Sequence, residues 1–386
     1  MGGRGAGRIL VVTNDFPPRR GGIESFVFSL CNGLPSADVV VYTAAMAGSA
    51  DLDSSVDYPV IRDRSRTLLP SRRLAREVRR TAREFGCTRV VFGAAAPLGL
   101  LAPHLRTAGI GRMVALTHGH EVWWATTPGS RSLLRRIAAE VDVVTYVSEY
   151  CRREIGRALP VDAAARMRRL SPDVDLERFG AAVPAGLEWR GRWQVGDRPV
   201  VLAASRLVAR KGHDVLLEAW PRVLASCPRA VLVIVGDGPR RRMLQRRISR
   251  LAITGSVRLM PSVGWDDMPG IYAAASVFAL PCRTRRRGRE PEALGLVFLE
   301  AAASRLPVVA GRSGGAPETV VDGVTGHVVN GRDAVAVAAA ISSVLTRPEL
   351  ANAMGMRGRA WVSEHYSGRA VYALQTALTD GRTGAA

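Results

Sequence analysis

Short apolar runs recur along the first half of the chain, separated by helical stretches. They read ILVVT, ADVVVYTA, TRVVFGAAA, RMVALTHGH and DVVTYVS. Each is apolar throughout instead of alternating, which is typical of a strand buried on both faces of a parallel sheet. The pattern restarts after residue 199 in VVLAASR, AVLVIVGDG, SVRLMPSV, SVFALPC and PVVAGR. This repeat predicts an α/β protein of two doubly wound, Rossmann-like domains that face a cleft, with ligands at the carboxyl ends of the strands.

The length of the chain and the position of its proline- and glycine-containing stretch predict where the domains divide. A chain of 386 residues is long enough for two domains of ordinary size. The polar stretch 171–199 carries prolines and glycines, which predicts an interdomain linker. We therefore expect an N-terminal domain over 1–183, a C-terminal domain over 184–365, and a C-terminal helix over 366–386 that packs back on the first domain. The leader MGGRGAG predicts a flexible end, and no run predicts a signal peptide or a transmembrane span.

The net charge of the chain indicates which classes of molecule it binds. Lysine and arginine number 54 against 34 acidic residues, which gives a net charge of +20, and Lys211 is the only lysine. Such an excess indicates an anionic partner, which can be nucleic acid, an anionic membrane surface or a phosphate-bearing substrate. Arginine-rich drift in a GC-rich genome is the alternative. The five scattered cysteines include no C-x-x-C pair, which argues against a zinc site and a disulfide framework and favours a reducing cytoplasm.

The stretch 71–84, SRRLAREVRRTARE, predicts an amphipathic helix. At about 100° per residue, Leu74, Val78 and Phe85 fall on one side and face the domain. Six arginines fall on the other, and with no acidic partner expected on that face they predict contact with anionic lipid headgroups. A solvated surface helix is the alternative. The six are Arg72, Arg73, Arg76, Arg79, Arg80 and Arg83.

Glycines follow predicted strands at two places. Gly21 and Gly22 lie between the first strand and a helix, where backbone amides and a helix N-terminus attract phosphate. Gly236, in GDGP, marks a tight turn at the rim of the cleft, but the spacing is not that of a Rossmann fingerprint. Each of these turns is also compatible with an ordinary strand-to-helix connection.

Two cations follow the first strand of the second half. Arg206 and Lys211 lie five residues apart in SRLVARKGHD. A bidentate guanidinium and a compact ammonium at one strand end can converge on a diphosphate. A solvated charge pair is the alternative.

Two acidic residues, Glu292 and Glu300, are separated by seven residues in EALGLVFLE. The segment Leu294–Leu296 predicts the start of a helix, with Glu292 in the loop before it and Glu300 within it. The amides of that N-terminus can hold a phosphate while the carboxylates accept hydrogen bonds from hydroxyls. Acidic residues are also favoured there simply as caps.

Two histidines, His118 and His120, close another strand in THGHE. On extended backbone they point in opposite directions, which is poor geometry for a shared metal. We therefore predict no metal site, with one histidine facing the cleft as a hydrogen-bond partner.

Taken together and in this order, these stretches resemble the retaining GT-B glycosyltransferases of family 4. SRLVARKGHD is similar to the family's G-R-L-x-x-x-K-G-x-D loop, and EALGLVFLE to its E-x7-E motif. DFPPRRGGIE and HGHE are similar to its N-terminal, acceptor-side signatures. The likeness covers essentially the whole chain and is greatest to the actinobacterial GDP-mannose-dependent phosphatidylinositol mannosyltransferases.

The resemblance implies roles for the basic and glycine residues. Arg206 and Lys211 would bind the donor diphosphate and stabilise the leaving charge. Gly21 and Gly22 would place backbone against the phosphates, and Gly236 would line the donor site.

The resemblance also implies roles for residues around the donor's sugar and nucleoside. Glu292 would contact the hydroxyls of the transferred sugar, with His118 beside it at the reaction centre. Glu300 would hold the ribose, and the base would lie near Val263. Amides around three residues would contact sugar and phosphate: Leu294, Gly295 and Leu296.

These roles imply a retaining transfer of mannose from GDP-mannose to a phosphatidylinositol mannoside, from the monomannoside to the α-1,6-linked dimannoside. The resemblance implies no divalent metal, a nucleotide sugar and a lipid acceptor as substrates, and a cytoplasmic enzyme peripheral to the inner face of the plasma membrane. Another donor, such as a UDP-sugar, or another acceptor stays open.

Two rival classes remain. A nucleotide-sugar epimerase can share this architecture, although E-x7-E favours transfer. A nucleic-acid-binding protein would account for the basic runs at 239–250 and 283–289. The chain shows no helix-turn-helix, RNA-recognition or zinc-finger signature, so we predict no nucleic-acid partner.

Overall fold

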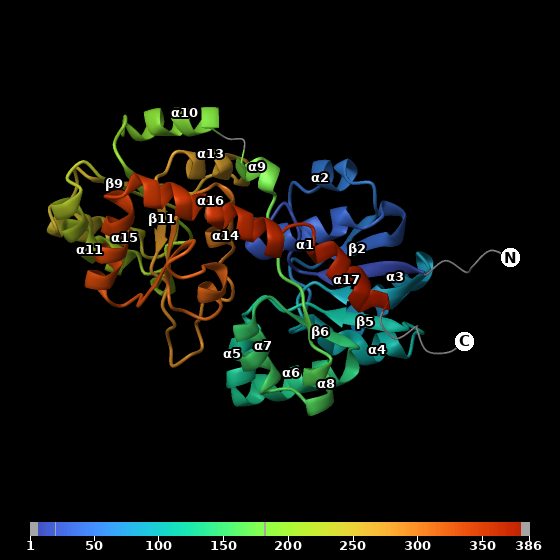
Figure 1. Ribbon diagram of the computed structural model, residues 1–386. Coiled ribbons are helices and arrows are strands. Elements are labelled where there is room, and N and C mark those ends of the chain that lie inside the picture. The colour runs from blue at the N-terminus through green and yellow to red at the C-terminus, as the bar shows by residue number, and fades with distance from the viewer. Residues whose placement is uncertain (1–6, 20, 181–182, 380–386) are drawn as a thin grey trace. The chain divides into compact units, whose positions relative to one another are not determined.

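The computed structural model describes residues 7–19, 21–180 and 183–379. The chain forms two compact units, Met1–Pro172 with Gly368–Ala386 and Asp173–Ser367 (Figure 1). A wholly parallel sheet forms the centre of each, which confirms the predicted fold class of two doubly wound domains.

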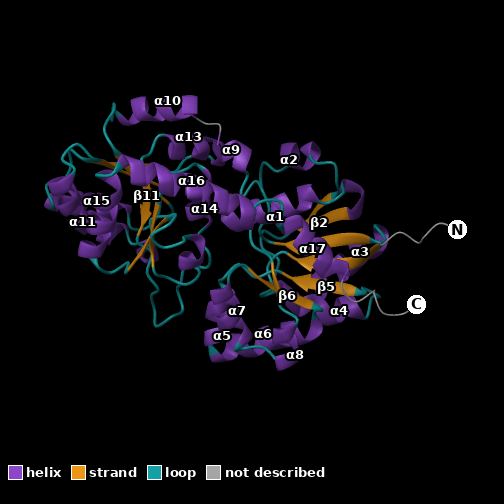
Figure 2. Cartoon of the chain, viewed as in Figure 1, coloured by secondary structure: helices purple, strands orange, loops and turns teal. Residues whose placement is uncertain are grey.

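Seven parallel strands form the sheet of the first unit, in the order β3-β2-β1-β4-β5-β6-β7. Figure 2 shows strands of this sheet, among them β2, β5 and β6, with helices packed around them. The direction of the strand order reverses between β1 and β4, so their carboxyl ends form a topological switch point. The strands are β1 (Arg8–Thr13), β2 (Val39–Thr43), β3 (Val60–Arg62), β4 (Cys87–Phe92), β5 (Arg112–Ala115), β6 (Val143–Tyr146) and β7 (Arg168–Arg169).

Helices cover both faces of this sheet. Those on one side form a layer in which α3 contacts α4 and α4 contacts α6. The helices are α1 (Gly22–Gly33), α2 (Ala50–Ser55), α3 (Arg72–Glu84), α4 (Ala102–Arg106), α5 (Glu121–Thr126), α6 (Pro128–Glu140), α7 (Glu149–Gly156), α8 (Val161–Ala165) and α17 (Ala370–Thr379).

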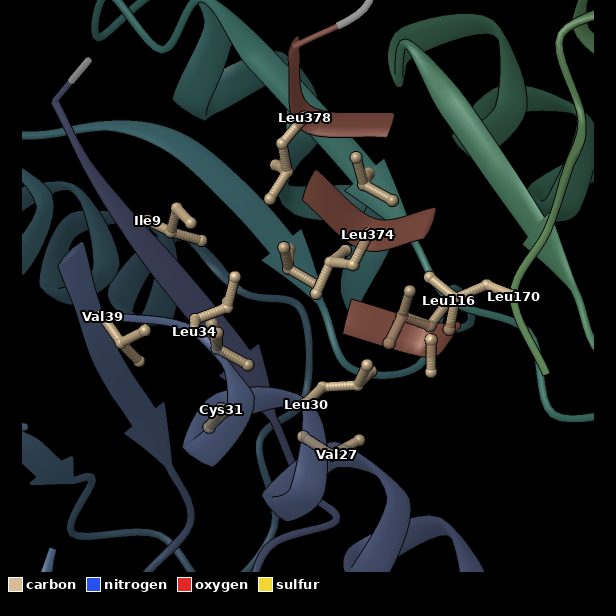
Figure 3. Packing of buried hydrophobic residues seen from close by; sticks show 14 of the residues in the cluster. Ile9, Val27, Leu30, Cys31, Leu34, Val39, Leu116, Leu170, Leu374 and Leu378 are labelled. Carbon is tan, nitrogen blue, oxygen red and sulfur yellow. The ribbon is translucent and has the colours of Figure 1, made fainter. Parts of the chain in front are cut away.

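The core of the first unit shows why its strands are apolar throughout. Ile9 and Val11 belong to a buried cluster that also takes side chains from α1 and α17, among them Leu30 and Leu374 (Figure 3). Successive side chains of a strand point to opposite faces, so the equally buried Leu10 packs on the other side of the sheet. The C-terminal helix α17 therefore packs within the first unit, against α1 and β5.

Six parallel strands form the sheet of the second unit, in the order β10-β9-β8-β11-β12-β13. Here the order reverses between β8 and β11. The strands are β8 (Val200–Ala204), β9 (Val231–Val235), β10 (Val257–Met260), β11 (Val277–Leu280), β12 (Val308–Gly311) and β13 (Gly326–Val329). The helices are α9 (Leu176–Gly180), α10 (Val183–Trp193), α11 (His213–Ser226), α12 (Arg241–Arg250), α13 (Met268–Ala273), α14 (Leu296–Ala303), α15 (Ala334–Leu345) and α16 (Pro348–His365).

The stretch 171–199 is not a linker, and that prediction is wrong. It contains α9 and α10, which both pack on α13 in the second unit. The buried side chains of Phe179 and Trp193 anchor them there, and Phe179 lies edge-on to Tyr272. The units divide after Pro172, whereas the sequence had placed the division after residue 183. The predicted flexible leader falls largely on residues 1–6, outside the described residues.

Candidate active site

Two loops flank the switch point of the second sheet, and they carry Arg206, Lys211 and Glu292 of the predicted site. One follows β8 and contains Ser205–Lys211, and the other follows β11 and leads to Glu292. A hydrogen bond from the Arg283 amide to the Arg210 carbonyl, 2.8 Å long, joins them. Ligands of open α/β sheets bind at this position, so the topology alone brings the two motifs to one site.

Glycines allow these loops to approach one another. Gly212 has a φ of +77°, and a Cβ there would lie 2.0 Å from the Pro281 carbonyl oxygen. A Cβ on Gly236 would lie equally close to the Ser205 carbonyl oxygen. Backbone from neighbouring strand ends therefore comes together with no room for a side chain, which explains glycine at Gly236 without a phosphate contact.

Lys211 and Glu292 form a buried ion pair, which the sequence did not reveal. The Lys211 Nζ lies 2.8 Å from Glu292 Oε2, and each side chain is 9% exposed. Burial would raise the pKa of Glu292, but Lys211 and then Arg210 lower it below its ordinary value. The buried Cys282 thiol donates a weak 3.7 Å hydrogen bond to the same oxygen. Glu292 is thus held as an anion.

Arg206 lies in the same loop, but its environment differs. Its side chain is exposed and forms no hydrogen bond or ion pair with any described residue. The loop beneath it is fixed by Ser205, whose hydroxyl lies 3.2 Å from Nε2 of the buried His213. Burial, followed by the charge of Lys211, lowers the pKa of His213 to about 3, so this histidine is neutral. The guanidinium of Arg206 is therefore available for an incoming anion.

Helix α14 begins where the sequence predicts. Leu296 is its first residue, and Gly295 precedes it with a φ of +91°, a left-handed conformation that favours glycine. Leu294 is buried and holds the turn in place, with Glu292 in the preceding loop. The Phe298 amide donates a 2.9 Å hydrogen bond to the Gly295 carbonyl, whereas helix geometry leaves the amides of Leu296 and Val297 without an acceptor within the helix. These two amides supply positive potential beside Glu292.

Glu300 lies one turn further into α14 and is buried. Its Oε2 accepts a 2.7 Å hydrogen bond from the hydroxyl of Tyr272, on α13. Burial raises the pKa of Glu300, and the tyrosine bond offsets only part of that increase. Tyr272 was not predicted as a site residue, because one tyrosine far along the chain carries no motif.

Val263 lies half-buried in the loop after β10. The neighbouring Ser262 donates hydrogen bonds to Asp237 Oδ2 from its amide (2.8 Å) and from its hydroxyl (2.7 Å). Asp237 is the middle residue of GDG, so this carboxylate joins the turn at Gly236 to the loop at Val263. The sequence predicted both places without predicting the link.

His118 belongs to the first unit, at the end of β5. Its Nε2 lies 2.6 Å from the Gly93 carbonyl oxygen, and its ring packs edge-on against Phe26 of α1. Burial lowers the pKa of His118, which favours the neutral ring. The segment that follows Gly21 and Gly22 therefore lies beside this histidine.

The expectation that His118 and His120 point in opposite directions is wrong. Gly119 has a φ of +98°, so the backbone is not extended and the two rings are nearly parallel, with centroids 6.4 Å apart. Glu121, fully buried, accepts hydrogen bonds from the amides of His118 and Gly119 at 3.0 and 3.2 Å. This carboxylate shapes the turn, and the sequence had treated it only as part of a motif.

Gly21 and Gly22 open α1 without left-handed backbone. Gly21 is extended, with a φ of 169°. A Cβ built there would meet the Glu24 carboxylate, whereas one on Gly22 would meet nothing within 4 Å. The glycines therefore leave the N-terminus of α1 open, with a single carboxylate folded over it.

Helix α3 forms as predicted, but its arginine face is not free of acidic partners. Arg73 binds Asp63 through two 2.9 Å hydrogen bonds, and Arg80 pairs with Glu77 at 2.8 Å. Arg79 is half-buried. Only Arg72, Arg76 and Arg83 are exposed without a hydrogen bond or ion pair to a described residue.

Within the described ranges, no group of three or more His, Cys, Asp and Glu side chains could hold a metal ion. No single described helix is long and apolar enough to span a bilayer. One bent pair, Ala334–Leu345 with Pro348–Thr379, reaches that length and composition only when its two parts are taken together.

Comparison with known proteins identifies the family. Residues 20–178 match the family described as "Glycosyltransferase Family 4", and residues 188–361 match "Glycosyl transferases group 1". A GDP-mannose-dependent alpha-(1-6)-phosphatidylinositol monomannoside mannosyltransferase of Mycolicibacterium smegmatis is 44% identical, over 97% of this chain and 98% of its own. A GDP-mannose-dependent monoacylated alpha-(1-6)-phosphatidylinositol monomannoside mannosyltransferase of Corynebacterium glutamicum is 40% identical, over 93% of this chain and 94% of its own.

Solved structures agree on the fold. Anabaena HepE in complex with UDP and glucose superposes with a TM-score of 0.78 at 21% identity, over 96% of this chain and 97% of its own. Sucrose-phosphate synthase from Thermosynechococcus elongatus gives a TM-score of 0.78 at 23% identity, over the same shares of the two chains. The chain belongs to the GT-B glycosyltransferases of family 4, which confirms the resemblance seen in its motifs.

Proposed function

We propose that this protein transfers mannose from GDP-mannose to a phosphatidylinositol monomannoside, forming an α-1,6 linkage with retention of configuration. The observation that carries this proposal is the buried Lys211–Glu292 pair beside the exposed Arg206, at the switch point of the second sheet. The names of the mycobacterial relatives supply the donor and the acceptor.

The site favours departure of a nucleoside diphosphate. Lys211, Arg206 and the first amides of α14 place positive charge where the leaving phosphate develops negative charge. Glu292, kept ionised by Lys211, accepts hydrogen bonds from hydroxyls of the transferred sugar.

We propose that the leaving group also serves as the base. The bond from the anomeric carbon to the β-phosphate oxygen breaks as the acceptor oxygen attacks the same face of the sugar. The acceptor's proton passes to the departing phosphate. Cationic side chains and amides supply the electrostatic stabilisation, so the proposal includes no divalent metal.

A transfer assay tests this directly. We expect a mannosylated product from GDP-mannose and the phosphatidylinositol monomannoside, at a rate unchanged by EDTA. UDP-glucose as donor and unmannosylated phosphatidylinositol as acceptor are the comparisons. A strict Mg²⁺ requirement would contradict the metal-free mechanism. Preference for UDP-glucose would reassign the donor, and epimerised nucleotide sugar without acceptor would indicate an epimerase.

We further propose that the enzyme works as a peripheral protein on the anionic, cytoplasmic face of the plasma membrane. On α3, Arg72, Arg76 and Arg83 keep free guanidinium groups directed outward. Helix α6 lies in the same layer and adds exposed arginines, of which Arg135 and Arg136 have no ion pair with a described residue. Each such cation near an anionic surface contributes about 1 kcal/mol.

Vesicle co-sedimentation tests the membrane proposal. The triple variant R72Q/R76Q/R83Q is expected to bind vesicles containing anionic phospholipid about 100-fold more weakly than the wild type, from about 1 kcal/mol per cation. R242Q/R246Q/R250Q removes three exposed arginines from α12 and is the matched control, which should bind as the wild type does. Equal binding of the wild type to neutral and anionic vesicles would contradict an electrostatic mechanism.

A further inference from the structure

The basic run RTRRRGR at 283–289 forms a short hairpin loop between β11 and α14. Backbone hydrogen bonds between Arg285 and Glu290, both 3.2 Å long, close the loop. Five of its seven residues are arginine. It lies in the segment that connects the switch point of the second sheet to Glu292.

The base of this loop is fixed to the site. Arg283 pairs with the half-buried Asp214 at 2.6 Å. The Thr284 hydroxyl lies 3.0 Å from that of Ser313, and the Ser313 hydroxyl accepts a 3.1 Å hydrogen bond from the Glu292 amide. A continuous chain of hydrogen bonds therefore runs from the base of the loop to the backbone of Glu292.

The backbone at the tip of the loop is strained. Arg286 and Arg287 have φ values of +50° and +54°, followed by Gly288 at +94°. Left-handed backbone is unfavourable for a residue with a Cβ, and glycine or asparagine adopts it readily. Arginine is therefore present at two successive positions where its backbone conformation is energetically unfavourable. Such strain gathers where a ligand must be held.

Most of the charge on this loop is uncompensated. Arg286 pairs with Glu290 at 3.0 Å. Arg285, Arg287 and Arg289 have no side-chain hydrogen bond or ion pair with any described residue, and Arg287 and Arg289 are exposed. These three guanidinium groups are available to an anion, and the planar fork of arginine matches phosphate oxygens.

The distribution of cations indicates which phosphate this is. Lys211, Arg206 and the N-terminus of α14 serve the donor diphosphate in the proposed function, and the three guanidinium groups of the loop are additional to these. Three Cα–Cα steps separate Arg289 from Glu292, so these Cα atoms lie within about 11 Å. In the proposed function, the further phosphate available to these groups is the phosphodiester of the acceptor.

We infer that Arg285, Arg287 and Arg289 form a binding site for the phosphodiester of the lipid acceptor. This inference rests on the proposed function, which supplies a phosphatidylinositol glycoside as acceptor. The loop selects acceptors that carry a phosphodiester and positions them relative to Glu292. Its contribution is to acceptor binding, so it affects KM for the acceptor and leaves donor binding unchanged.

The test compares the wild type with R285Q/R287Q/R289Q in neutral detergent micelles that contain no anionic lipid other than the acceptor, and then in anionic vesicles. The acceptors are the phosphatidylinositol monomannoside and a neutral alkyl mannoside that lacks the phosphodiester. For the first acceptor we expect KM to rise at least about tenfold, as for the loss of a charge-assisted hydrogen bond. KM for GDP-mannose and the rate with the neutral mannoside should stay at wild-type values.

Two further variants make the result specific. R242Q/R246Q/R250Q, with the same change in charge on α12, should behave as the wild type. R285K/R287K/R289K keeps the charge and should restore part of the affinity. An unchanged acceptor KM would overturn the inference, as would an equal loss with the neutral mannoside, or an effect confined to anionic vesicles.

The wild-type measurement separates the two proposals. A wild type that transfers mannose to the monomannoside, together with an unaffected loop variant, overturns only the role of the loop. A wild type inactive with every phosphatidylinositol acceptor overturns the proposed function and the loop's role with it.

Discussion

Replacing Lys211 with alanine is expected to lower kcat/KM by about 10²–10³-fold, as for the loss of one group that stabilises developing negative charge. The same change should also destabilise the fold. It leaves Glu292 buried with only Arg210, 3.6 Å away, as a counter-charge. Breaking a buried ion pair from one side costs about 3–5 kcal/mol of unfolding free energy. Turnover assays and denaturant unfolding at pH 7 measure the two effects.

The pH dependence of the stability loss in K211A follows from the pKa of Glu292. In the wild type this pKa is lowered, so its contribution to stability is present above the unfolded pKa and disappears as pH falls through the folded pKa. In K211A the main lowering influence is absent. The stability deficit of the variant should therefore be greatest at neutral pH and shrink below about pH 4.5.

Two variants separate the chemistry from the packing. R206A should lose activity to a similar degree with unchanged stability, because Arg206 is exposed and has no partner among the described residues. K211R keeps the positive charge but replaces a slender ammonium with a wider fork. We expect it to fold as the wild type does and to lose most of its turnover. Near-normal activity of K211R would show that the single lysine of the chain is not needed as such.

The sequence allowed the fold to be predicted because continuous apolar strands and their order dictate a parallel sheet. It also predicted the start of α14, since Gly295 and the following apolar residues form a local signal. Local signals carry less information where packing decides. Helix α16 contains Gly355 and Gly358, which normally disfavour a helix, yet Gly355 lets the helix approach the Arg305 carbonyl oxygen, 2.0 Å from where a Cβ would be.

In the site, too, local sequence motifs could be predicted, whereas contacts between distant residues could not. The two motifs could be found in the chain, but the Lys211–Glu292 bond could not, because it joins residues 81 positions apart (292 − 211) across two strand ends. Asp237 and Tyr272 were missed for the same reason. The Asp63 partner of Arg73 lies outside its helix, so a helical wheel could not reveal it.

Replacing Glu300 with glutamine is expected to weaken GDP-mannose binding about 10–100-fold, the range for losing a hydrogen bond to a charged group. The carboxylate holds the ribose in the proposed function. The fold should not suffer, because an ionised buried carboxylate is itself costly and glutamine has nearly the same shape. A variant that loses donor affinity but unfolds at or above the wild-type temperature would therefore indicate a binding role.

The raised pKa of Glu300 predicts how stability and GDP affinity change with pH. A folded-state pKa above the unfolded value means that stability from this group is fully present below the unfolded pKa and is lost as pH rises through the folded pKa. Binding changes in the opposite direction, because a ribose hydroxyl is held best by the ionised form. GDP affinity of the wild type should therefore fall more steeply with decreasing pH than that of E300Q. Protonation of the terminal phosphate of GDP, whose second pKa is about 6, weakens binding in both alike.

Tyr272→Phe is the matched control, since it removes only the hydroxyl that donates to Glu300 Oε2. Without that donor the pKa of Glu300 rises further, so the loss of GDP affinity should begin at a higher pH than in the wild type. Calorimetric titration of GDP, and of its analogue without the ribose 2′-hydroxyl, from pH 5 to pH 8 measures each variant. If E300Q still distinguished the two ligands as the wild type does, Glu300 would not be the group that binds the ribose.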